Sequence, residues 1–162
     1  EASRQHVPID EYKKNLSAIV SAVRSCGDES ARVLLLTPPP VDGPAWHRYC
    51  IDVYGAEPDA EPNRTFENTQ KYAEACIEVA KSCDAPVVNM FEAVAADPDW
   101  KLSFVDGLHP NVRGNQVIYN TLSAAIKQHF PDLNSETLPL DFPDHKAIDY
   151  KNPVILPSST WN

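Results

Sequence analysis

A short apolar segment that ends at three consecutive prolines limits the fold of this chain more than any other feature. Residues 32–37 read Arg-Val-Leu-Leu-Leu-Thr, and prolines occupy positions 38–40. An unbroken apolar run of this length is typical of a β-strand that is covered on both faces, as in a parallel sheet flanked by helices. We therefore expect this strand to lie inside a layered sheet.

The rest of the chain alternates between helical and strand-like patterns. Apolar residues at helical spacing predict helices, and a second apolar run predicts another strand. The expected order is helix 8–25, strand 32–37, helix 64–83, strand 85–90, a short helical turn at 91–96, and helix 111–130. This order predicts a layered α/β fold with a parallel sheet.

The number of strands is too small for this fold, because three amphipathic helices need more sheet than two strands provide. One explanation is that further strands lie unrecognised in 41–62 or 100–105. The other is that the chain is the C-terminal portion of a larger fold whose first βα units are absent. The proline-rich stretch 38–62 is expected to be a binding loop or a disordered insert.

Charge and hydropathy exclude two classes of partner. The chain has 14 Lys and Arg residues and 23 Asp and Glu residues, so its net charge is −9. This charge argues against nucleic acid as a binding partner, because phosphate binding needs clustered cations. No apolar run approaches the roughly 20 residues that span a bilayer. The four cysteines form no CxxC pair and are interpreted as buried or half-buried free thiols of a reducing compartment, so we expect a cytoplasmic protein.

One local pattern has catalytic content, namely Asp106-Gly107-Leu108-His109-Pro110. Ester cleavage by a nucleophile needs an imidazole that accepts a proton and a carboxylate that orients the imidazole. Asp106 and His109 can meet in a tight turn if Gly107 adopts unusual backbone angles, and Pro110 is expected to begin the following helix. A capping or surface role for the pair stays open from the residues alone.

Taken together, these features resemble the SGNH, or GDSL-type, hydrolases, and within them the isoamyl-acetate-hydrolysing esterase group. Asp106-Gly107-Leu108-His109 followed by Gly114-Asn115 carries the resemblance most strongly. The other matching stretches, in the same order along nearly the whole chain, are 5–8 with 12–16, 33–41, 72–76 with 79–80, 87–91 and 138–143.

The resemblance implies a three-layer α/β/α, flavodoxin-like fold with a parallel sheet and with the N-terminal βα units absent from this chain. Residues 1–130 would be the C-terminal part of a single domain, and 131–162 an extended tail packed on it. Leu138, Leu140, Phe142, Ile148 and Trp161 are expected to anchor this tail.

The resemblance also implies a reaction, the hydrolysis of small or short-acyl carboxylic esters through a Ser-His-Asp triad, without metal or organic cofactor. His109 would be the general base and Asp106 its orienting carboxylate. The Gly-Asp-Ser-type block of the nucleophile and the oxyanion-hole glycine and asparagine have no counterpart in residues 1–162. The expected partners are a small ester and the missing N-terminal portion or another polypeptide that completes the sheet.

Two alternatives remain open at this stage. The chain is either part of an active esterase or a catalytically inactive, SGNH-derived structural or interaction subunit of a larger assembly.

Trp46 and Tyr49 in the proline-rich stretch either form an acyl-pocket wall or lid, or anchor a long loop to the core. The Asp106 carboxylate and the His109 imidazole are expected to lie about 2.6–3.2 Å apart.

Overall fold

Eight elements of secondary structure follow one another in the computed structural model, which describes residues 6–26, 31–134, 136–138, 148 and 151. In chain order they are α1 (Ile9–Cys26), β1 (Leu35–Leu36), α2 (Gly43–Tyr54), α3 (Phe66–Ser82), β2 (Val87–Val88), α4 (Met90–Ala95), the 3₁₀ helix η1 (Trp100–Ser103) and α5 (Val112–His129). The chain divides into two units, residues 1–125 and 126–162, and the features below belong to the first, apart from the last residues of α5 and the exposed Leu138 and Ile148.

The two strands pair in parallel, with Leu35 opposite Val87 and Leu36 opposite Val88. The backbone N–H of Leu35 donates to the carbonyl of Pro86 at 2.9 Å, and that of Thr37 donates to the carbonyl of Val88 at 3.0 Å. The prediction of two adjacent parallel strands is confirmed, although each is shorter than expected.

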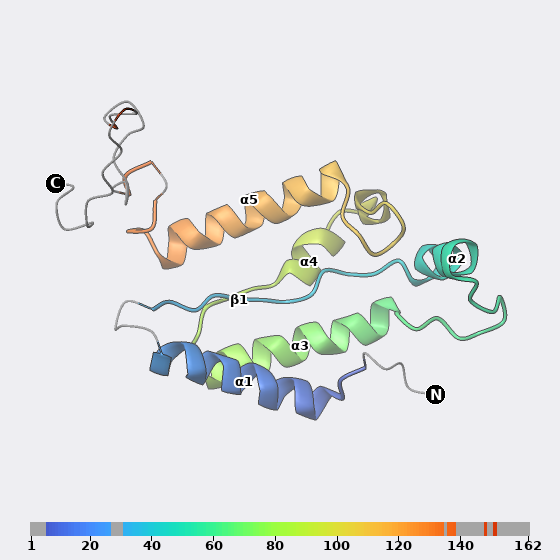
Figure 1. Cartoon of the computed structure of the whole chain (residues 1–162), viewed down its shortest axis with the longest axis horizontal. Coiled ribbons are helices and arrows are strands. Elements are labelled where there is room, and N and C mark those ends of the chain that lie inside the picture. Colours follow the sequence, from blue (N-terminus) through green and yellow to red (C-terminus); the bar gives the residue numbers. More distant parts are fainter. Residues whose placement is uncertain (1–5, 27–30, 135, 139–147, 149–150, 152–162) are drawn as a thin grey trace. The chain divides into compact units, whose positions relative to one another are not determined.

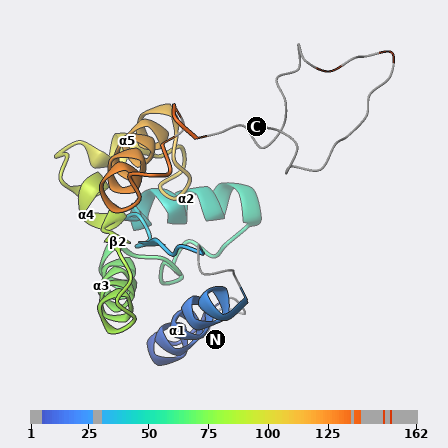
Figure 2. The same ribbon diagram turned by 90° about the vertical axis from the view of Figure 1, so that its left-hand side faces the viewer.

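Helices cover both faces of the sheet, as Figures 1 and 2 show, with α1 and α3 on one side and α4 and α5 on the other. One apolar cluster joins Val33, Leu35 and Val87 to α1 and α3. The other joins Leu34 and Val88 to α4 and α5. Successive strand residues point to opposite faces, so the two clusters alternate along each strand. The expected three-layer α/β/α architecture is confirmed.

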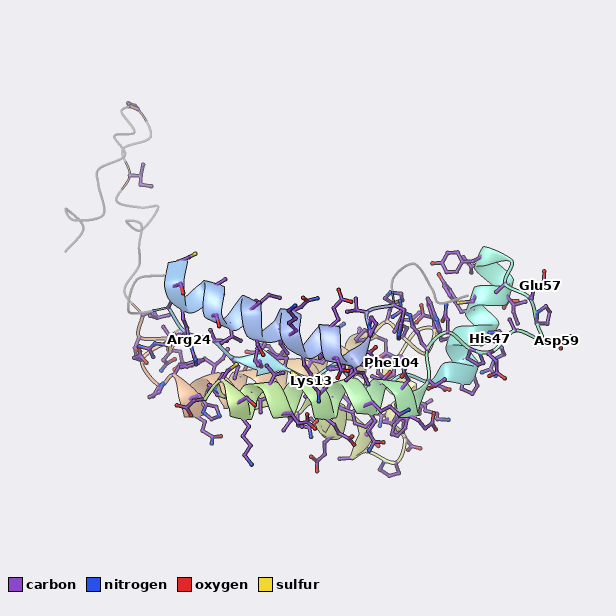
Figure 3. The ribbon with its side chains drawn as sticks, turned by 90° about the horizontal axis from the view of Figure 1, so that it is seen from below. Lys13, Arg24, His47, Glu57, Asp59 and Phe104 are labelled. Atoms are coloured by element: carbon purple, nitrogen blue, oxygen red, sulfur yellow. The ribbon has the colours of Figure 1, made fainter. Side chains whose placement is uncertain are left out.

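Polar contacts at both ends of α1 fasten it to α3 and to the turn after it. The Lys13 ammonium lies 2.5 Å from the Glu78 carboxylate, and Figure 3 shows Lys13 where α1 lies along α3. Near the other end, the Arg24 guanidinium donates to the carbonyls of Cys83 and Asp84. These contacts orient α1 on the face of the sheet remote from α5.

The expectation of a loop over 38–62 is wrong, because this stretch contains the twelve-residue helix α2. Pro44 lies in the first turn, where a residue without an N–H is tolerated. The Asp42 side chain accepts the backbone N–H of Ala45 at 3.4 Å, and Gly55, with φ +66°, ends the helix. Prolines here therefore mark the start of a helix rather than the absence of one.

The edge of β1 that faces away from β2 has no strand beside it in the described part of the chain. The stretches suspected of hiding strands form α2 and η1 instead, so that explanation of the small sheet is wrong. Leu36 is 42% exposed. It borders a cavity of about 880 Å³ between α1, β1 and α3, whose lining includes Tyr12, Tyr72 and Arg64.

Other expectations have mixed outcomes. Cys50 and Cys76 are buried and Cys83 is partly buried, but Cys26 is exposed. Leu138 and Ile148 of the expected tail are exposed. Leu140, Phe142 and Trp161 lie outside the described residues, so the division at residue 130 stays a prediction. No helix among the described residues is long and apolar enough to span a membrane.

Candidate active site

Asp106 and His109 lie in a tight turn that links η1 to α5. The backbone N–H of Val105 donates to the carbonyl of His109 at 2.8 Å, and an isolated antiparallel bridge pairs Phe104 with Pro110. Phe104 is buried in the α4–α5 cluster. The two ends of the turn are therefore closed on each other and anchored in the core.

One carboxylate organises the turn. Oδ1 of Asp106 accepts the backbone N–H groups of Leu108 at 2.9 Å and of His109 at 2.8 Å. Its other oxygen, Oδ2, lies 2.6 Å from Nδ1 of the His109 imidazole. The expectation that the two side chains lie within hydrogen-bonding distance is confirmed.

The two partners differ in exposure, with the Asp106 side chain 5% exposed and that of His109 64% exposed. Burial by itself would raise the pKa of Asp106. The hydrogen bonds from the His109 backbone, the His109 imidazole and the Leu108 backbone outweigh burial, so this pKa lies below its ordinary value of 3.8. The carboxylate is ionised at neutral pH and can only accept, so Nδ1 of His109 donates. In the neutral imidazole, Nε2 is then the nitrogen that can accept a proton.

The start of α2 holds the turn from outside. The backbone N–H of Asp42 donates to the carbonyl of Gly107 at 2.9 Å. Gly107 has φ +92°, and a Cβ atom there would lie 2.5 Å from the Asp42 carbonyl oxygen and 2.7 Å from the Trp46 backbone nitrogen. Only glycine fits this position, because it allows both the positive φ and the close approach.

An aromatic cluster on α2 lies beside the imidazole. The Trp46 and His109 rings are 5.9 Å apart between centroids and inclined by 72°, and Tyr49 stacks on Trp46 at 5.6 Å. Trp46 is 6% exposed and packs with Val41 and Cys50 in a third apolar cluster. Trp46 therefore anchors α2 in this cluster and also lies beside the His109 ring, whereas a role as acyl-pocket wall or lid stays a prediction.

Asn111 is a site-supporting residue that the sequence analysis missed. Its side-chain oxygen accepts the backbone N–H of Gly114 at 3.2 Å in the first turn of α5, and its side-chain nitrogen donates to the Leu102 carbonyl at 2.7 Å. The expectation that Pro110 begins the helix is wrong, since α5 starts at Val112. An asparagine immediately before the periodic apolar residues was the available signal.

Among the described residues, no group of three or more His, Cys, Asp and Glu side chains is arranged to hold a metal ion. The candidate site consists of the Asp106–His109 pair, the turn that carries it and the aromatic face of α2. A carboxylate-oriented imidazole of this kind is suited to proton transfer.

Comparison with known proteins agrees with the class that this fold suggests. The sequence model of the GDSL-like Lipase/Acylhydrolase family matches residues 3–117. The chain belongs to this family, which confirms the resemblance noted from the motifs.

Curated relatives extend the match over nearly the whole chain. A GDSL esterase/lipase of Arabidopsis thaliana is 35% identical over 94% of the chain and 62% of its own length. An isoamyl acetate-hydrolyzing esterase 1 homolog of Rattus norvegicus is 33% identical over 96% of the chain and 59% of its own length. The chain thus spans about three-fifths of the length of these relatives.

Solved structures share the fold at lower identity. A lipase/acylhydrolase from Enterococcus faecalis superposes with a TM-score of 0.61 at 21% identity, covering 78% of this chain and 56% of that one. An acetylxylan esterase from Geobacillus stearothermophilus gives a TM-score of 0.54 at 21% identity, covering 80% of this chain and 51% of that one. These likenesses concern the fold alone.

Proposed function

We propose that this chain is the part of a serine esterase that carries the general base and its orienting carboxylate. The substrates would be small or short-acyl carboxylic esters, with Asp106 and His109 as two members of a Ser-His-Asp triad. The observation that carries the proposal is the 2.6 Å contact between the buried Asp106 carboxylate and Nδ1 of an otherwise exposed imidazole. Family membership and the names of the relatives support the same reaction.

In the proposed mechanism, Nε2 of His109 takes the proton of a serine hydroxyl as its oxygen attacks the ester carbonyl. The ionised Asp106 stabilises the imidazolium that forms. The imidazolium then gives its proton to the departing alcohol, which leaves an acyl-serine. In the second half, Nε2 takes a proton from water, the hydroxide displaces the acyl group as a carboxylic acid, and the proton returns to the serine.

The serine and the oxyanion-hole donors are proposed to come from polypeptide outside these 162 residues. No Gly-Asp-Ser block and no Gly-x-Asn-Asp block occurs in the chain. Supplied alone, the chain should therefore be inactive, because a base and its carboxylate have no hydroxyl to activate.

The same outside polypeptide is proposed to pair with the open edge of β1. Leu35 and Thr37 donate their N–H groups to the β2 side. Alternate residues of a parallel strand face opposite neighbours, so the N–H of Leu36 is directed to the open edge. The exposed Leu36 side chain and the cavity of about 880 Å³ beside it provide apolar surface for an added strand.

Hydrolysis of p-nitrophenyl acetate tests this function in two preparations, the 162-residue chain alone and a longer polypeptide that joins it to a Gly-Asp-Ser-containing segment. The longer form should turn over the ester, and His109→Ala should lower its kcat by roughly 10³–10⁶. His129→Ala, which removes another exposed histidine, should leave turnover unchanged. His109-dependent turnover by the chain alone would contradict the placement of the serine.

The absence of a nucleophile block from the chain favours one other function, that of an inactive structural subunit. In that case the longer polypeptide would hydrolyse the ester at the same rate with and without His109. Retention of the Asp106–His109 contact argues for catalysis, because a purely structural subunit needs neither the exposed imidazole nor its buried carboxylate.

A further inference from the structure

The His109 imidazole is held by few contacts, although a general base must present one nitrogen in a fixed direction. Its side chain is 64% exposed, and a hydrogen bond joins its Nδ1 to Oδ2 of Asp106. A single hydrogen bond selects the tautomer but still allows the ring to tilt about the line between the two atoms. A second contact is needed to set the direction of Nε2.

Trp46 supplies the second contact. The edge-to-face arrangement of the two rings, 5.9 Å apart at 72°, lies within the favourable range for aromatic pairs. The backbone of Trp46 also packs against Gly107 inside the turn, where a Cβ would lie 2.7 Å from the Trp46 nitrogen. The same residue therefore contacts both the imidazole and the turn that carries it.

Trp46 is itself held rigidly. Its indole Nε1–H donates to the side-chain oxygen of Asn63 at 2.9 Å, and the guanidinium of Arg64 lies 5.8 Å from the centre of its ring. Tyr49 stacks on it with an inclination of 22°. With 6% of its surface exposed, the indole has little freedom to move with the imidazole.

We infer that Trp46 is a positioning residue for the esterase reaction, which acts through His109 by fixing the tilt of its imidazole. This inference rests on the proposed function. It differs from a role in binding the ester, because a positioning residue affects the chemical step and has no effect once His109 is removed.

The test is a double-substitution cycle in the longer, active polypeptide. Trp46→Leu keeps apolar bulk but removes the ring, and should lower kcat by between about 10-fold and 100-fold with little change in KM. In the His109→Ala background the same substitution should have almost no further effect. Trp46→Phe, which keeps an aromatic ring, should restore part of the loss.

A matched control separates positioning from a general loss of packing. Phe91→Leu removes another buried aromatic ring, which packs against Phe66 and not against His109. It should lower the melting temperature as Trp46→Leu does, but leave kcat unchanged. An equal factor for Trp46→Leu with and without His109, or a change in KM alone, would overturn the inference.

A readout that needs no activity keeps the inference separate from the proposed function. In the 162-residue chain, the His109 ring should sample more than one orientation in Trp46→Leu but not in Phe91→Leu, measured from the nuclear Overhauser contacts of its ring protons with the turn. If the longer polypeptide is inactive in every form, the esterase proposal fails. A single, unchanged His109 ring orientation in Trp46→Leu would overturn the positioning role.

Discussion

The turn that carries Asp106 and the open edge of β1 differ in completeness. Asp106 uses both carboxylate oxygens on partners within three residues of itself. The ladder of β1 is satisfied on the side of β2, and its opposite edge has no strand beside it in the described residues. The proposed base and its carboxylate are thus linked by hydrogen bonds within the turn and supported by α2, whereas the open edge of β1 has no such partner in the described residues.

This difference suggests that the Asp106–His109 pair can fold without the segment that carries the proposed serine, although catalysis would need both. A turn that closes on itself can form without the nucleophile segment. A strand edge needs its neighbour before its polar groups and apolar side chains are covered. Substitutions in the turn should therefore affect the isolated chain and the longer polypeptide alike, while changes at the edge should distinguish them.

The largest effect is expected from Asp106→Asn in the active, longer polypeptide. The amide oxygen can still accept the two backbone N–H groups, so the turn should survive. The amide nitrogen would replace Oδ2 opposite Nδ1 of His109 and favour the wrong tautomer. We expect kcat to fall by about 10⁴, measured with p-nitrophenyl acetate. A loss below tenfold would mean that Asp106 only supports the turn.

Gly107→Ala should destabilise both forms of the protein. Its methyl group would meet the Asp42 carbonyl oxygen and the Trp46 nitrogen at a positive φ. We expect the free energy of unfolding in urea to fall by about 3 kcal/mol or more. Gly55→Ala is the matched control, because Gly55 also has a positive φ but no atom within 4 Å of the added methyl. It should cost about 1 kcal/mol, and equal losses would show that close packing at Gly107 is unimportant.

Amide hydrogen exchange rates should distinguish the residues of β1 that pair with β2 from Leu36, which faces the open edge. In the 162-residue chain, the amide of Leu36 should exchange faster than those of Leu35 and Thr37, which donate to β2. In the longer polypeptide, Leu36 should become protected while its two neighbours change little. Equal protection of all three amides in the chain alone would contradict an open edge.

The smallest effect concerns acid stability. The pKa of Asp106 is lowered in the folded state, so its contribution to stability is present above the ordinary value of 3.8 and is lost as the pH falls toward the folded-state pKa. Below pH 4, urea unfolding should show a steeper loss of stability for the unsubstituted chain than for Asp106→Asn. Asp52→Asn, which removes an exposed carboxylate of α2, should keep the steeper loss.

Local signals in the sequence predicted much of this molecule. The helices α1, α3 and α5 begin and end within about two residues of the expected positions, because amphipathic periodicity and strong boundaries coincide there. The strands were located but proved shorter, since Asn89 already caps α4 directly after β2. Asp106 and His109 were predicted because they lie three positions apart and the hydrogen bonds between them form within the turn.

Contacts between distant segments were beyond such signals. The prolines around α2 suggested a loop, although Asp42 followed by Pro44 is also the local pattern of a helix start. Trp46 and His109 are more than sixty residues apart, so their contact depends on the packing of α2 against the turn. Asn111 escaped notice because Pro110 offered a stronger, but wrong, signal for the start of α5.

The three prolines after β1 have a consequence for the behaviour of the chain in solution. An open strand edge is a template on which other molecules can stack, and natural proteins limit such edges to avoid aggregation. Beyond Leu36 and Thr37, the backbone at positions 38–40 has no amide hydrogens to donate. We propose above that this edge pairs with one partner strand. It is therefore too short, and has too few amide donors, to seed a growing fibril. The net charge of −9 adds repulsion between copies of the chain.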